Sequence, residues 1–248
     1  RAGYKHPSFA ARTAESSDYL QGAVVAIDPE DGDLLALVGG RNYAASHVDR
    51  APNALRQPGS SHRPTVYATA IHATLTAASI VYDTARAVPL ERNGVYRPRN
   101  DDGQFLGPMT VRDALVRSRN PVAVQLGLAE GMDTISALAR ALGITTPISP
   151  YPASAIGASA ARPIEMVAAY AAFDNDGSSV TTRFIHRITD AAGMQVYTEH
   201  SAARDSVPDP RVAFIVRHLM RAVVGRGTAH PVRPYPPARL AAAGEHGP

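Results

Sequence analysis

The sequence has no cysteine and only one lysine, Lys5, among its 248 residues. Without cysteine the chain can form no disulfide, no thiolate metal site and no thiol nucleophile. Because lysine occurs only at position 5, the sequence supplies no neutral amine for chemistry inside the domain. The nine histidines show no H-E-x-x-H or similar spacing. We therefore expect neither a metal site nor another cofactor.

Long hydrophobic runs and blocks of like charge are also lacking. No uncharged apolar run approaches the roughly 18–20 residues that span a bilayer, and residues 1–6 lead into no apolar segment of the signal-peptide kind. Any membrane contact is expected only through a segment outside this chain, which does not begin with Met. The arginines are dispersed and the net charge is only +3, so no nucleic-acid partner is expected. A content of 45% hydrophobic and 19% charged residues predicts a folded globular domain.

The hydrophobic pattern predicts strands first, then a block of helices, then strands and a helix again. A first hairpin joins strands at 22–28 and 33–40, and its nearly continuous apolarity predicts burial on both faces. Turn residues throughout 41–59 and 76–107 predict loops, the longer of which is expected to form a wall of a cleft. The other expected elements are helices at 60–75, 110–116, 122–130, 133–142, 163–173 and 210–224, and strands at 183–188, 194–197 and 239–243. This grouping favours an α/β fold of the α+β kind, with a mostly antiparallel central sheet flanked by helices and a helical lobe.

The segment Arg56-Gln57-Pro58-Gly59-Ser60 delivers a serine to the start of an apolar run that predicts a buried helix. A hydroxyl there lies near unpaired backbone N–H groups and the positive end of the helix dipole. That setting suits a nucleophile that forms an acyl ester through a transient oxyanion. It equally suits an N-cap, the common role of a serine before a helix.

Ordered blocks along the chain resemble the transpeptidase domain of class A penicillin-binding proteins. The blocks are residues 22–29, 38–41, 56–60, 102–110, 114–115, 118–120, 155–158, 163–166 and 225–229. The resemblance covers roughly residues 21–248, so we expect a linker or entry segment at 1–21 and a transpeptidase domain at 22–248. It implies a fold similar to that of the serine β-lactamases, with the family's C-terminal strands missing and the domain incomplete at that end.

The resemblance also implies roles for individual residues. The family uses three motifs, S-x-x-K, S-x-N and K-[ST]-G. Ser60 matches the serine that attacks the penultimate D-Ala carbonyl of a peptidoglycan stem peptide. Ser118 matches the serine that relays protons, and Asn120 matches the asparagine that holds the substrate amide.

The implied partners are peptidoglycan stem peptides and the β-lactams that imitate them. An upstream glycosyltransferase domain and cell-wall assembly proteins are further candidate partners. The implied location is extracytoplasmic, in the periplasm or at the outer face of the cytoplasmic membrane, with a membrane anchor in the full-length protein.

The chain departs from the family pattern at the positions that carry the chemistry. Arg63 stands in place of the lysine of the first motif, and a guanidinium stays protonated in proteins, so Arg63 cannot accept the Ser60 proton. Arg63 could instead stabilise an oxyanion or hold a carboxylate. Because His62 lies two residues from Ser60, it would not face that serine on a helix.

The third motif differs at each of its defining positions. Glu245, His246 and Gly247 stand where the family has K-[ST]-G, so Glu245 would repel the substrate carboxylate that the family lysine attracts. Pro248 has no N–H to contribute to an oxyanion hole. His246 is a candidate substrate contact or replacement base, although a terminal histidine without such a role is the commoner case.

Three hypotheses follow from these departures. The first is a D,D-transpeptidase-type domain whose acylation is impaired. The second is a non-catalytic scaffold, similar to a penicillin-binding protein, that binds stem peptides or cell-wall partners. The third is an incomplete or mis-read fragment of an active protein, with the altered third motif at its truncated end.

Overall fold

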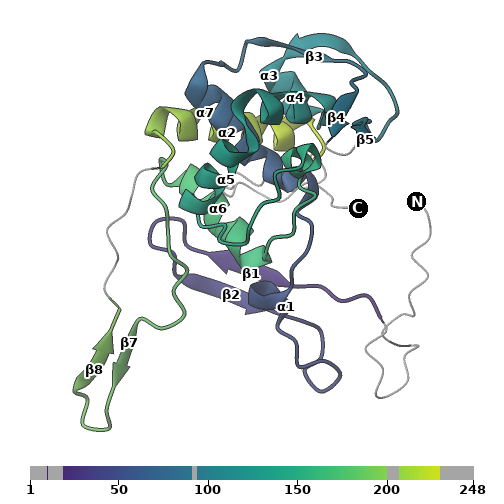
Figure 1. Ribbon diagram of the computed structural model, residues 1–248. Coiled ribbons are helices and arrows are strands. Elements are labelled where there is room, and N and C mark those ends of the chain that lie inside the picture. The colour runs from purple at the N-terminus through teal and green to yellow at the C-terminus, as the bar shows by residue number, and fades with distance from the viewer. Residues whose placement is uncertain (1–9, 11–18, 91–93, 200–206, 230–248) are drawn as a thin grey trace.

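The structure, a computed structural model, describes residue 10 and residues 19–90, 94–199 and 207–229. A helical lobe stands on one β-hairpin, and a second hairpin projects to one side (Figure 1). The helices are α1 (Arg50–Asn53), α2 (Arg63–Ala73), α3 (Val111–Val116), α4 (Asn120–Glu130), α5 (Met132–Ala141), α6 (Pro163–Asp174) and α7 (Pro210–Arg226), with 3-10 helices η2 (Gly59–His62) and η4 (Pro152–Ile156). The strands are β1 (Val24–Ile27), β2 (Leu34–Val38), β3 (Ile80–Asp83), β4 (Val88–Leu90), β5 (Gly94–Tyr96), β6 (Gly107–Thr110), β7 (Arg187–Thr189) and β8 (Gln195–Thr198).

Helix α2 lies at the centre of the hydrophobic core. Every residue from Arg63 to Ile71 is buried, as expected for a helix that other elements enclose on all sides. Helices α4, α5 and α7 pack against it (Figure 1). The largest apolar side chains that are fully buried include Tyr67, Phe173, Ile135, Leu142, Leu219 and Met220. This packing fixes the start of α2, and the turn that precedes it, relative to the start of α4.

The strands pair in antiparallel fashion, as the sequence predicts, which confirms the α+β organisation. The pairs are β1 with β2, β3 with β6, β4 with β5 and β7 with β8. Within the described residues these are separate two-stranded sheets rather than the single central sheet that was predicted. The predicted strand at 239–243 lies outside the described residues.

Several element boundaries are confirmed and others are wrong. Thr110 caps α3 by accepting a hydrogen bond from the Asp113 N–H at 3.0 Å, as predicted. Residues 76–107, predicted as an irregular loop, hold the short strands β3, β4 and β5 between their turns. Helix α4 begins at Asn120 rather than 122, because proline is tolerated in the first turn, where its missing N–H has no helical partner.

Two further predictions about helices need correction. The predicted loop at 41–59 contains α1, whose first turn is capped by the side chain of Asp49. Helix α7 continues to Arg226 instead of closing at Gly225, because one glycine lowers helix propensity without necessarily ending a helix.

The predicted burial of the first hairpin on both faces is also wrong. Helix α6 packs against β1, yet the side chains of Val24, Leu35 and Val38 are 59%, 66% and 51% exposed. An apolar strand is buried on both faces only where a second layer covers it. No second layer among the described residues buries these three side chains.

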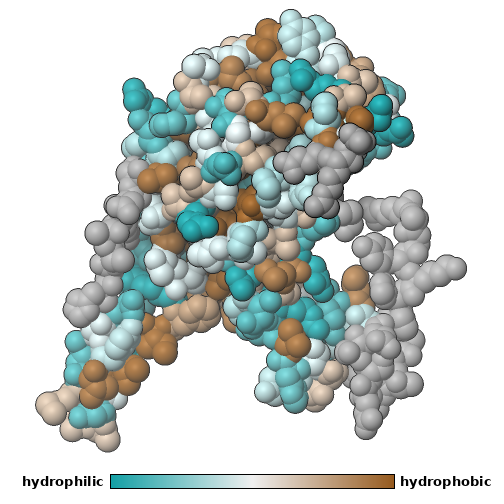
Figure 2. Space-filling view, viewed as in Figure 1, coloured by the Kyte–Doolittle hydropathy of each residue, from teal (hydrophilic) through white to brown (hydrophobic). Residues whose placement is uncertain are grey.

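The β7–β8 hairpin projects away from the helical lobe (Figure 1). Its apolar side chains, including Ile188 and Val196, are exposed. Brown surface is visible over this hairpin in Figure 2. A search of the described helices for one long and apolar enough to cross a bilayer finds none.

Candidate active site

Backbone contacts hold Ser60 in place. It lies in the 3-10 turn η2, not at the N-cap of α2, because the α-helix begins only at Arg63. The prediction that Ser60 opens the helix is therefore wrong by one turn. The N–H of Gly59 bonds to the carbonyl of Gly157 at 3.2 Å, and a Cβ added at Gly157 would meet the Gly59 oxygen at 2.0 Å. Only glycine at 157 permits this approach.

A second backbone contact lies a few residues upstream. Arg56 and Ala161 exchange two backbone hydrogen bonds, of 3.0 and 2.9 Å, in an isolated bridge. Downstream, the Tyr170 hydroxyl of α6 donates to the carbonyl of Ser61 at 2.8 Å. The segment that carries Ser60 is thus held before and after the serine.

Ser118 reaches Ser60 from the connection between α3 and α4. Its φ of 57° lies in the left-handed region, which is uncommon for a residue other than glycine. Its hydroxyl donates to Ser60 Oγ at 3.2 Å, across 58 residues of sequence. Left-handed backbone at a non-glycine residue persists only where the surrounding structure enforces it, and such residues are concentrated at functional sites.

Arg63 joins the same cluster from the first residue of α2. Its side chain is only 2% exposed, and its guanidinium donates to Ser118 Oγ and to Asn120 Oδ1. The structure therefore brings together Ser60, Arg63, Ser118 and Asn120, all predicted as site residues from the sequence. Their predicted roles in chemistry stay predictions.

Asn120 is held on both its backbone and its side chain. Its N–H donates to Asn100 Oδ1 at 2.8 Å, and its side-chain Nδ2 donates to the carbonyl of Arg99 at 2.6 Å. Both partners lie in the segment between β5 and β6, the stretch predicted to form a wall of the cleft. That segment is therefore directly bonded to the serine cluster.

Sequence reasoning missed the residues that support this wall. Asp83 is fully buried; it accepts hydrogen bonds from Asn100 Nδ2 at 2.8 Å and the Leu106 N–H at 3.0 Å, and it lies 3.7 Å from Arg119 Nε. Arg119 also binds both oxygens of Asp102, at 3.0 and 2.9 Å. One signal was available, since Arg119 is the middle residue of the Ser-x-Asn motif. Asp83 and Asn100 carry no such signal.

Burial lowers the pKa of His62 to about 4, because desolvation disfavours the imidazolium. The ring is therefore neutral at pH 7, and its Nε2 is buried without a hydrogen bond to the described residues. It makes no hydrogen bond to Ser60, in agreement with the prediction that this spacing turns it away. The predicted third-motif residues Glu245, His246 and Gly247, and Pro248 after them, lie outside the described residues.

Comparison with known proteins identifies the family. The penicillin binding protein transpeptidase domain matches residues 22–242. The chain belongs to this family. It is therefore a transpeptidase domain of the penicillin-binding type.

Individual relatives agree with this assignment. The chain is 36% identical over 210 residues to penicillin-binding protein 2D of Bacillus subtilis, covering 84% of this chain and 30% of that protein. It is 34% identical over 219 residues to penicillin-binding protein 1A of Neisseria meningitidis serogroup A, covering 85% of this chain and 27% of that one. The chain thus spans less than a third of these relatives' length.

The fold also matches a solved structure of the family. Penicillin-binding protein 1A from Haemophilus influenzae superposes with a TM-score of 0.81 at 24% identity, covering 86% of this chain and 38% of that chain. This likeness confirms the predicted β-lactamase-like transpeptidase fold.

Proposed function

We propose that this domain keeps a transpeptidase-type cleft for the D-Ala-D-Ala end of peptidoglycan stem peptides, and for β-lactams, but forms the acyl-serine slowly or not at all. The observation that carries the proposal is the placement of buried Arg63, which donates to both Ser118 and Asn120. The first hypothesis from the sequence, an impaired transpeptidase-type domain, is thereby supported by geometry.

The direction of the hydrogen bonds opposes activation of Ser60. Arg63 donates to Ser118, and Ser118 in turn donates to Ser60. Attack on a carbonyl requires the opposite, an acceptor that takes the Ser60 proton as the new bond forms. A guanidinium stays protonated in proteins and does not serve as that acceptor. His62 makes no hydrogen bond to Ser60, and burial weakens it as a base.

A substrate that binds Asn120 must compete with hydrogen bonds that this side chain already makes. Its Oδ1 accepts from Arg63 and its Nδ2 donates to the Arg99 carbonyl. A peptide amide that pairs with this side chain must displace one of these bonds, and the bond to a charged donor is the stronger of the two. Binding is therefore expected to be weak but not abolished.

The direct test is to incubate the protein with benzylpenicillin and measure its intact mass over time. We expect no stoichiometric adduct within an hour, because none of the described residues around Ser60 is placed to accept its proton. Ser60→Ala is the matched control, since it removes only the hydroxyl. A rapid one-to-one adduct in the wild type that is absent from Ser60→Ala would show that the site is active.

A second measurement tests whether the missing base at position 63 is the only defect of the site. In Arg63→Lys the amine is restored at its family position, but Glu245 and Pro248 still depart from the third motif. Removing a single oxyanion donor typically costs about 10²–10³ in rate, so we expect the variant to stay unlabelled on the same timescale. Rapid labelling of Arg63→Lys would instead make Arg63 the sole defect.

The setting proposed for the domain follows from its relatives. Because the chain spans less than a third of them, we place it in a longer, extracytoplasmic and membrane-anchored protein with a glycosyltransferase domain upstream. If D-Ala-D-Ala peptides bind without any acylation by β-lactams, the scaffold hypothesis is favoured, with cell-wall assembly proteins as partners.

A further inference from the structure

We propose that the cleft wall beside Asn120 carries an anion-binding subsite formed by Arg86, Arg97 and Arg99, and that it binds the carboxylates of an acidic peptide. The inference rests on the proposed function, since the peptide is taken to be the continuation of a chain whose end lies at the serine cluster. Nothing in the three motifs assigns a role to these arginines.

The three arginines line one concave site. A pocket of about 450 Å³ lies between the segments that flank the β4–β5 hairpin, and all three side chains contribute to its wall. Pro98 and Phe105 provide apolar surface in the same wall. A pocket that combines apolar surface with a few polar groups of one kind is typical of a ligand site.

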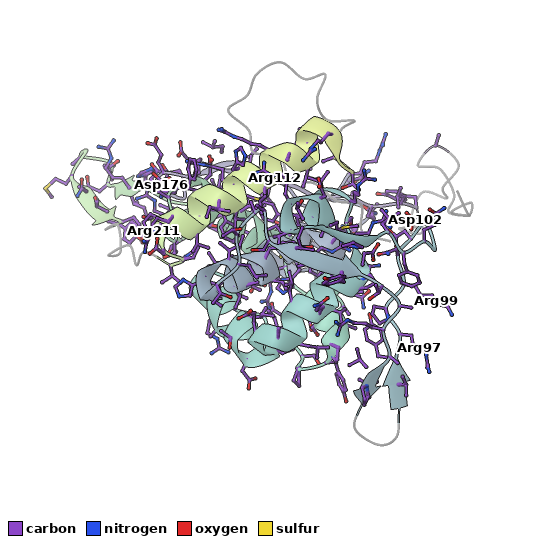
Figure 3. The ribbon with its side chains drawn as sticks, turned by 90° about the horizontal axis from the view of Figure 1, so that it is seen from above. Arg97, Arg99, Asp102, Arg112, Asp176 and Arg211 are labelled. Carbon is purple, nitrogen blue, oxygen red and sulfur yellow. The ribbon has the colours of Figure 1, made fainter. Side chains whose placement is uncertain are left out.

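The backbone of this wall displays its charges toward solvent. Arg97 and Arg99 are exposed while Pro98 and Asn100, which alternate with them, are buried, as expected in an extended segment with one inward face. Figure 3 shows both arginines on the outer side of the segment that leaves the β4–β5 hairpin. Asn100 anchors the segment through bonds to Asp83 and to the Gln104 carbonyl at 2.8 and 2.7 Å. Arg97 and Arg99 therefore lie on a segment that these hydrogen bonds hold in place.

In the described part of the chain, their positive charge is not paired with a carboxylate. Asp102, the acidic residue of this wall with a defined partner, is bound through both oxygens to Arg119. Within residues 19–90, 94–199 and 207–229, no ion pair involves Arg86, Arg97 or Arg99. Clustered guanidinium groups repel one another, and an anion that bridges them relieves that repulsion. Their planar forks match the two oxygens of a carboxylate.

The subsite is connected to the serine cluster. The Arg99 carbonyl accepts the Asn120 Nδ2 hydrogen bond at 2.6 Å, so one residue belongs to both the pocket and the site. In the sequence, Glu245 replaces the lysine with which the family attracts a substrate carboxylate. The arginine wall supplies positive charge elsewhere in the cleft. Its apolar part and its contact with a peptide site favour an acidic peptide over a bare phosphate polymer.

The test compares two dye-labelled peptides by fluorescence anisotropy. Both end in D-Ala-D-Ala; one carries two glutamates before that end, and the other carries two glutamines. We expect the wild-type protein to bind the glutamate peptide about tenfold more tightly in low salt, an advantage built from weak, exposed charge contacts. Added salt is expected to reduce the advantage.

The variant Arg86→Gln/Arg97→Gln/Arg99→Gln is expected to lose this preference and bind both peptides alike. Arg140→Gln/Arg187→Gln/Arg221→Gln is the matched control, because it also removes three exposed arginines, and it is expected to keep the preference. Circular dichroism checks that both variants fold, as expected when only exposed side chains change.

Several outcomes would overturn the inference. They are equal binding of the two peptides by the wild type, no binding of either, or loss of the preference in both variants, which would indicate net charge alone. Inorganic triphosphate that displaces the glutamate peptide at much lower concentration, in a manner dependent on the same arginines, would assign the pocket to phosphate polyanions. The proposed function fails separately, through a rapid penicillin adduct at Ser60, and that result leaves the peptide comparison intact.

Discussion

Arg63 and Arg119 are both buried arginines next to Asn120, but they bind different kinds of partner. Arg119 lies against the carboxylates of Asp83 and Asp102, so its charge is balanced and it ties β3 to the segment between β5 and β6. Among the described residues, the acceptors that Arg63 binds are the neutral oxygens of Ser118 and Asn120. Burial alone therefore does not tell these two arginines apart, whereas the acceptor atoms described for each do.

The largest expected effect is a loss of unfolding free energy on replacing Arg119, and it distinguishes Arg119 from Arg63. Arg119→Met leaves the fully buried Asp83 carboxylate without its cation, and breaking a buried pair in this way typically costs about 3–5 kcal/mol. Urea denaturation measures the loss in unfolding free energy. Arg117→Met, a change at an exposed arginine two residues away, is the control and is expected to lie within about 0.5 kcal/mol of wild type. A loss below 1 kcal/mol for Arg119→Met would contradict the structural role that the comparison assigns to Arg119.

A smaller loss is expected for the same change at Arg63. Arg63→Met deprives the neutral oxygens of Ser118 and Asn120 of a donor, which typically costs about 1–3 kcal/mol. The same urea measurement applies. If Arg63→Met proves more destabilising than Arg119→Met, Arg63 is chiefly a structural residue and the contrast between the two arginines is reversed.

The smallest expected effect tests a buried carboxylate, that of Glu165, which accepts hydrogen bonds from hydroxyl and backbone N–H groups and pairs with the Arg162 guanidinium at 3.1 Å. Glu165 accepts bonds from Thr145 and Thr146 at 2.6–3.1 Å and from the Arg162 N–H at 3.0 Å. Burial raises its pKa, but the hydrogen bonds from Thr145, Thr146 and Arg162 outweigh burial, so the net shift is downward. Glu165→Gln is expected to cost about 1–2 kcal/mol at pH 7.

The sign of that pKa shift gives the pH dependence. Because the folded pKa lies below the ordinary value of 4.5, the stabilisation by Glu165 is complete above that value and is lost as pH falls through the lowered folded pKa. The difference in unfolding free energy between wild type and Glu165→Gln should therefore shrink from pH 5 downward. A difference that stays constant from pH 7 to pH 3 would contradict this account.

The site could be predicted where its residues follow ordered motifs. Ser60, Ser118 and Asn120 were predicted because the family keeps their order and spacing, and Arg63 followed from its position three residues after the serine. The partners of its hydrogen bonds could not be predicted, since they depend on how α2 packs against α4. That packing is a tertiary property.

Other features of the fold could not be predicted from local sequence patterns, and the physical reason can be given for each. Asp83 and Asn100 meet across 17 residues of turns and short strands, where no periodicity shows which polar groups approach each other. The exposure of Val24 and Leu35 was missed because an apolar strand does not show which layers cover it. The turn that holds Ser60 was missed because a 3-10 turn and the first turn of an α-helix have similar sequence preferences.

The close approach of Gly59 and Gly157 has an evolutionary consequence. Ser60 is positioned mainly by main-chain contacts, which substitutions of nearby side chains leave in place. A lineage can therefore exchange the base, the substrate cation or the oxyanion donor while the serine stays where it is. Geometry of this kind does not depend on those groups, so a family likeness around Ser60 does not by itself show activity.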